Sequence, residues 1–178
     1  MAFTITAPYT GLPLIASADV GQTTANSSTV IPTIPAKLGM IVTANDPTFG
    51  DGEFILLTGV ASNAVGTVVQ YDGTTFVPTI PTAATVNKSG MPLAVSMSTA
   101  TAAQFGWYQI SGTAVVKKTT VKFTNKQAIG FVSTGVIGKN ASGVQIIGAR
   151  TANTTSIASA TTTIAVTINR PHMMGRIT

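Results

Sequence analysis

Cysteine is absent from this chain of 178 residues, and charged residues are scarce. Without cysteine, the protein can form neither a disulfide framework nor a thiolate site. Only 8% of the residues are Asp, Glu, Lys or Arg, against roughly 25% in an ordinary soluble domain. A surface so poor in charge is hydrated through Thr, Ser, Asn and Gln side chains, or is covered by other subunits. The composition therefore favours an oligomer or a protein docked on a partner.

Long apolar runs are lacking too. The runs that exist are short, such as Phe54 to Leu57, and none approaches the roughly 20 residues that span a bilayer. No basic residue precedes an apolar stretch at the N-terminus, so we expect neither a signal peptide nor a membrane contact. A chain of this length can bury enough surface to fold without a metal or disulfide, and we expect no cofactor.

Acidic residues are missing from the second part of the chain. All five lie within the first 72 residues, at Asp19, Asp46, Asp51, Glu53 and Asp72. One base, Lys37, accompanies them, which gives that part a formal charge of −4; nine bases and no acid follow, which gives +9. This asymmetry indicates a basic face that meets an acidic partner, or head-to-tail complementarity between subunits, unless the two parts mix in the fold.

From Leu38 onward, the sequence alternates short apolar runs with turn residues, which predicts antiparallel strands throughout. A hairpin is expected through Asp72-Gly73, because this pair accepts the positive φ of a tight turn. A single helical turn, with Ser98 as its cap, is expected over 98–104, and the tail should leave the sheet at Pro171. The predicted fold is all-β: an antiparallel β-sandwich, a jelly-roll-like fold or a small barrel. The expected strands are 39–43, 53–60, 66–71, 75–80, 91–97, 128–137, 144–149 and 164–168, and 121–124 alternates in the same way.

The stretch 104–118 holds the only tryptophan, Trp107, with Phe105 and Tyr108 beside it. Large rings bury more apolar area than other side chains, so these three are expected to anchor the core. Phe54 and Phe131 would add to it. The pattern indicates a strand, a Ser-Gly bend and a second strand that ends in two lysines.

Residues 1–37 differ from the rest because they are rich in proline, which opposes both helix and central strand. We expect an extended N-terminal arm over 1–37, ordered by lying on a partner, ahead of a β domain over 38–178. The domain should then fold without residues 1–15. The alternative is an edge strand, 3–6, paired within the domain. The arm residues expected to meet the partner are Phe3, Ile5, Pro8, Tyr9 and Leu12.

Catalytic signals are weak. The only histidine, His172, follows a proline in the tail, and no cluster of His, Cys or carboxylates surrounds it in the sequence. Asp51 and Glu53 are the only near pair of carboxylates, and Asp51-Gly52 is also an ordinary turn. We therefore predict no catalytic residue and do not expect an enzyme.

A basic run is the best candidate for contact with nucleic acid. It comprises Lys117, Lys118, Lys122 and Lys126. A single-strand binder would also need exposed aromatics among the bases, whereas Phe123 fits the inward face of its strand. We expect the lysines to protect a strand edge or to meet an acidic partner, and we do not expect nucleic acid as a partner.

The segment 105–117, Phe-Gly-Trp-Tyr-Gln-Ile-Ser-Gly-Thr-Ala-Val-Val-Lys, resembles a stretch of the head decoration, or cement, proteins of tailed bacteriophages. That stretch reads Tyr/Phe-Gly-Trp-apolar-Gln-apolar-x-Gly-x-Ala-x-Val. Residues 66–74 are similar to the early strands of those proteins, and the N-terminal arm lies outside the resemblance. The resemblance implies a β-sandwich or jelly-roll-like homotrimer. It would be made in the host cytoplasm and bound to the outside of the virion, where it clamps neighbouring subunits of the major capsid protein.

A second hypothesis is a receptor- or glycan-binding module of a phage fibre or cell surface. Such a module would present exposed aromatic rings, flanked by polar groups, in a concave site. The candidates are Tyr9, Tyr71 and Tyr108.

Overall fold

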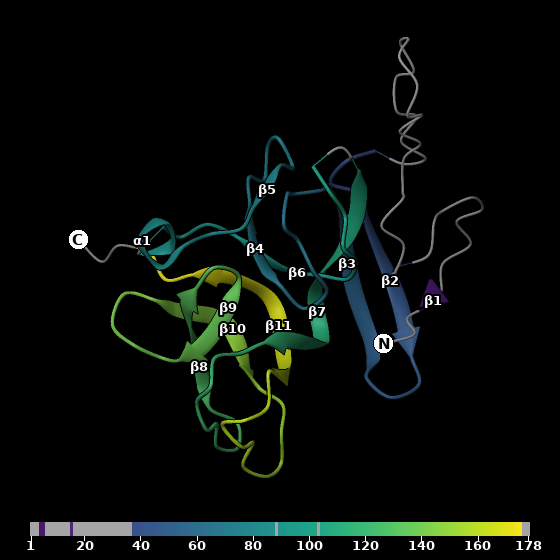
Figure 1. The fold of residues 1–178 in the computed structure, drawn as a ribbon. Coiled ribbons are helices and arrows are strands. Elements are labelled where there is room, and N and C mark those ends of the chain that lie inside the picture. Colours follow the sequence, from purple (N-terminus) through teal and green to yellow (C-terminus); the bar gives the residue numbers. More distant parts are fainter. Residues whose placement is uncertain (1–3, 6–14, 16–36, 88, 103, 176–178) are drawn as a thin grey trace.

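The protein is described by a computed structural model that covers residues 4–5, 15, 37–87, 89–102 and 104–175. The predicted all-β class is confirmed, since almost all the regular secondary structure of the described residues is antiparallel strand (Figure 1). They form one sheet in the order β1-β2-β3-β7-β11-β10-β8-β9, with β6 beside β7 and β4 between β6 and β5. The elements are β1 Thr4–Ile5, β2 Ile41–Asp46, β3 Gly50–Thr58, β4 Val68–Tyr71, β5 Pro78–Thr79, α1 Ala83–Val86, β6 Leu93–Ser96, β7 Phe105–Lys117, β8 Ala128–Ser133, β9 Val136–Lys139, β10 Gln145–Thr151 and β11 Thr163–Met173.

Strand β7 is the centre of the sheet. Its first half pairs with β3 and, at Tyr108 and Gln109, with β6; its second half pairs with β11. The predicted bend that would divide this segment into two strands is wrong, because β7 runs unbroken for 13 residues. Gly112 makes this possible. Its φ is +97°, and a Cβ there would lie 2.5 Å from the carbonyl oxygen of Asp51, so only glycine lets the two strands approach.

The first half of β7 is buried on both faces. Successive side chains of a strand point to opposite faces, so Trp107 and Tyr108 enter different clusters. Trp107 packs in the cluster that contains Phe54, and Tyr108 packs in the cluster that contains Ile55. Trp107 and Tyr108 are both 0% exposed and Phe105 is 8% exposed, so all three rings lie in the core.

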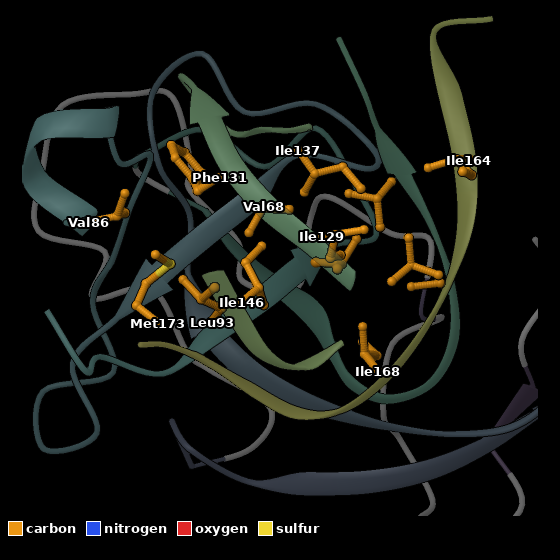
Figure 2. Close-up of a cluster of buried hydrophobic side chains, with 14 of the residues drawn as sticks. Val68, Val86, Leu93, Ile129, Phe131, Ile137, Ile146, Ile164, Ile168 and Met173 are labelled. Carbon is orange, nitrogen blue, oxygen red and sulfur yellow. The ribbon is translucent and has the colours of Figure 1, made fainter. Parts of the chain in front are cut away.

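A third cluster lies beyond β7, where the sheet curves around it. Figure 2 shows side chains from several strands directed into one common interior. Phe131 and Phe123 belong to this cluster, which leaves a void of only about 10 Å³ lined by apolar side chains. The amide of Val68 donates to Gly135 O at 2.9 Å, and Lys118 forms a single parallel bridge with Ile137. These contacts bring the β8–β9 edge next to β4 and to the end of β7.

The described N-terminal residues pack on their own domain. Thr4–Ile5 pairs antiparallel with β2, opposite Asn45 and Ala44. Ile5 is half-buried against the Trp107 cluster, and Ile15 is only 2% exposed within it. The edge-strand alternative therefore describes Thr4–Ile5, and the predicted arm that lies on a partner does not describe Ile5. The remaining predicted arm contacts lie outside the described residues: Phe3, Pro8, Tyr9 and Leu12.

The short helix lies elsewhere than predicted. The described residues of 98–104 form only bends and a turn, and the helix α1 begins after Thr82 instead. Thr82 and Thr85 satisfy each other's backbone amides as a capping box, at 2.9 and 3.4 Å. At Ser98, the carbonyl oxygen accepts from the Ser96 hydroxyl at 2.8 Å. The same oxygen accepts from Asn63 Nδ2 at 3.3 Å, and this tertiary bond holds the segment and overrides its local helical preference.

Two further details differ from the sequence prediction. The hairpin between β4 and β5 is present, but the positive φ falls on Phe76, because the connection spans 72–77 instead of a tight two-residue turn. Strand β11 continues through Pro171 to Met173. A register shift in β10 between Ile147 and Ala149 lies opposite the proline, so its missing N–H interrupts the ladder where the ladder is already irregular.

Candidate interaction surface

One face of the sheet is polar and half-exposed over β7, β11 and β10. Residues directly opposite each other in a ladder share a face, and the register places Thr113 opposite Thr167 and Thr167 opposite Arg150. The alternate residues of β7 and β11, such as Ala114 and Val166, fill the core behind them. We call this surface the threonine face; it comprises Ser111, Thr113, Val115, Lys117, Arg150, Thr163, Ala165, Thr167 and Asn169.

The threonine face ends in a hollow at its β10 edge. The hollow has a volume of about 370 Å³ and lies among Gly148 to Arg150 and Thr167 to Asn169. It forms where β10 bulges: Gly148 has a φ of +75°, and a Cβ there would lie 2.6 Å from Asn169 O. Arg150 and Asn169 are exposed at its walls, so their side chains supply hydrogen-bond donors to whatever enters it.

The predicted basic run is divided by the fold. Lys122 and Lys126 are exposed in the loop between β7 and β8, and Lys117 is half-buried on the threonine face. Lys118 is only 5% exposed, which corrects the prediction that it belongs to a surface patch. Strand alternation explains this difference, since Lys117 and Lys118 are adjacent on the chain and point to opposite sides.

Lys118 is a structural cation. Its Nζ donates to the carbonyl oxygens of Val121, Thr119 and Ser159 at 2.9, 3.0 and 3.3 Å. It also lies 5.8 Å from the centre of the Phe123 ring, within the range of a cation–π contact. Burial lowers the pKa of Lys118 from its ordinary value. The ammonium group ties the loop that follows β7 to the loop that precedes β11.

The charge asymmetry of the sequence is also an asymmetry in space. The acids Asp46, Asp51 and Glu53 lie on the hairpin of β2 and β3. Exposed bases occupy β8–β10 and the loop before them, which we call the basic lobe; they are Lys122, Lys126, Lys139 and Arg150. These two parts are at opposite ends of the strand order, and Figure 1 shows them on opposite sides of β7 and β11. The two halves therefore mix little in space; the exceptions are Asp72 in the β4–β5 turn and the contact of Glu53 with Arg170.

The candidate catalytic residues have structural roles or stand alone. Asp51 accepts a hydrogen bond from Asn45 at 2.9 Å, and Glu53 forms an ion pair with Arg170 at 3.2 Å. His172 is exposed on β11. Within the part of the chain that the structure describes, no three His, Asp or Glu side chains gather as metal ligands. Among the described residues, no helix has the length and apolar character that a membrane span requires.

The two described tyrosines expected in a glycan site are buried or half-buried. The hydroxyl of Tyr108 donates to Thr58 O at 3.3 Å and lies 3.4 Å from the amide nitrogen of Asn63. Burial raises the pKa of Tyr108, and it also raises that of Tyr71, which is half-buried. Tyr9 lies outside the described residues. Tyr71 and Tyr108 therefore do not form the exposed aromatic platform that the glycan-binding hypothesis requires.

Comparison of the chain with protein-family models, curated protein sequences and solved structures finds no match. The class that the fold defines is an all-β protein, and its described surface includes a polar sheet face and two separated regions of charge.

The sequence analysis missed the threonine face. Its signal was present, because Thr163, Ala165, Thr167 and Asn169 alternate with apolar residues in the last strand. What sequence could not supply was the pairing of β11 with β7 and β10, since residues about 50 positions apart in β7 and β11 meet only after folding.

Proposed function

We propose that this protein is a structural virion protein, a capsid decoration protein that docks its threonine face on the outer surface of a phage head. It acts by covering the boundary between major capsid subunits. The resemblance of 105–117 to phage decoration proteins suggests the partner, and that segment is the strand β7 on which the sheet is built.

The observation that carries the proposal is the composition of the threonine face. Its side chains are short and mostly uncharged between Lys117 and Arg150. Thr, Ser, Ala and Val lose little rotamer entropy on burial, and interface centres are depleted of charge with charged groups at the rim. The regular pleat behind the face gives a rigid surface, which suits a protein that binds by area.

Co-sedimentation with heads of the phage that carries this chain tests the proposal. Wild-type protein should pellet with heads. Thr113→Arg places a long cation in the middle of the face and should weaken binding at least tenfold without changing the unfolding midpoint, because the position faces outward. Thr74→Arg adds the same charge in the exposed β4–β5 turn and should bind like wild type.

Either of two results contradicts this account. If wild-type protein stays in the supernatant at micromolar concentration, the proposed function is wrong. If Thr113→Arg pellets as well as Thr74→Arg, the docking face is wrong.

A further inference from the structure

Within the part of the chain that the structure describes, no ion pair joins the acidic hairpin to the basic lobe. No acid follows Asp72 in the sequence, so the basic lobe contains no carboxylate of its own. The backbone of Arg150 pairs with Thr167 and Ala128, but within the described residues its side chain makes no hydrogen bond or ion pair. The acidic hairpin lies at the other end of the strand order, with β7 and β11 between.

The acidic hairpin is built to present a carboxylate. Asp46 uses Oδ1 to accept from the amides of Thr48 and Phe49 at 2.8 and 3.0 Å, which holds the turn closed. Asn45 steadies the exposed Asp51 by a bond at 2.9 Å to one of its two oxygens. Glu53 is engaged by Arg170, so Asp51 is the carboxylate that the hairpin offers outward.

The basic lobe offers a matching receptor. Arg150 stands beside the hollow at Gly148, with the amide of Asn169 on its other wall. Lys126 is close by, since Arg150 lies opposite Ala128 and the neighbouring Thr151 hydroxyl accepts from the amide of Gln127 at 2.7 Å. An arginine guanidinium binds a carboxylate with two parallel hydrogen bonds, and a second cation nearby strengthens the attraction.

We propose that copies of this chain associate head-to-tail, with Asp51 on the β2–β3 hairpin of one copy bound at the Arg150 hollow in the basic lobe of the next. A two-fold arrangement that brought lobe against lobe would place like charges together, whereas the head-to-tail arrangement pairs unlike charges. Contacts of this kind between different surfaces close into rings when the rotation permits, and a trimer is one such ring. The contact uses only the β10 edge of the threonine face, where Arg150 and the hollow lie, and it leaves the β7 side around Thr113 open to dock on another surface.

Charge reversal tests the contact in the full chain. Sedimentation velocity of the wild type at low salt should show an oligomer that dissociates as the salt concentration rises, because exposed charge pairs are screened within about 10 Å at 0.1 M salt. Asp51→Arg and Arg150→Asp should each weaken association about tenfold or more. The double variant, Asp51→Arg with Arg150→Asp, should restore it.

The control is Lys37→Asp, which reverses an exposed charge outside both regions and should leave association unchanged. Circular dichroism melting checks that each variant is folded. A wild type that sediments as a monomer at every salt concentration overturns the proposal. So does an oligomer that both single reversals leave intact, or a double variant no better than the single ones.

Discussion

At the scale of single residues, Lys118 shows how a charge can serve the core of a protein. A buried ammonium is tolerable only when hydrogen bonds replace its water shell. Three backbone carbonyls do so here. If the ammonium is removed, the three carbonyl oxygens lose their hydrogen-bond donor at a site with little access to water. An unsatisfied buried polar group costs about 1–3 kcal/mol.

Lys118→Met should therefore lower the free energy of unfolding by about 2–3 kcal/mol, measured by urea denaturation at pH 7. Fluorescence of the single buried tryptophan reports the transition. Lys117→Met is the matched control, because Lys117 is adjacent on the chain and half-exposed. This substitution should lower the free energy of unfolding by less than about 0.5 kcal/mol. Equal losses in the two variants would contradict the structural role of Lys118.

The pH dependence of Lys118 follows from its lowered pKa. The folded protein releases this proton at a lower pH than the unfolded chain does, so the unfolded state binds more protons as the pH approaches about 10.4. Stability that depends on Lys118 thus rises with pH in that window. The difference in the free energy of unfolding between wild type and Lys118→Met should widen from pH 8 to pH 10. A difference that narrows over this range would contradict the lowered pKa of Lys118.

At the scale of elements, the N-terminal segment belongs in part to the domain that it precedes. Ile15 lies in the cluster that contains Trp107 and Phe54. Removing residues 1–15 would open that cluster, so the expectation that the domain folds intact without them does not fit the structure. The prediction that other residues of 1–37 contact a partner does not depend on the burial of Ile15.

Ile15→Ala should lower the free energy of unfolding by about 2–4 kcal/mol, in the range for a buried large-to-small change. Ile41→Ala removes the same atoms from a side chain that is 38% exposed and should cost less than 1 kcal/mol, or about a quarter as much. Urea denaturation of both variants checks this. If Ile15→Ala is no more harmful than Ile41→Ala, the segment is not anchored in the core.

How far the sequence predicts these elements depends on the range of the interactions that decide them. Most strands were predictable, because alternation and turn residues are local signals. The predicted helix at 98–104 and the predicted bend at Ser111-Gly112 were wrong. The tertiary bond from Asn63 to Ser98 decided the first segment, and the close approach of Asp51 to Gly112 decided the second. Lys118 could not be distinguished from the other lysines of the basic run by sequence. Adjacent strand residues point to opposite faces, so a buried lysine can directly follow one on the surface.

At the scale of the whole molecule, the features fit the proposal of a protein that works through contact area. Low charge and a polar sheet face suit docking on a large surface. The separated charges suit association between copies, and several docked faces on one oligomer would multiply weak contacts into firm attachment. These functional statements stay proposals, and their common consequence is mechanical: a bound copy should hold neighbouring capsid subunits together.

The most direct measurement is the temperature at which phage heads lacking this protein break open, followed by light scattering with and without added wild-type protein. Our account predicts that saturating protein raises this temperature, and that Thr113→Arg raises it much less. Heads that break at the same temperature with and without saturating wild-type protein would contradict the account.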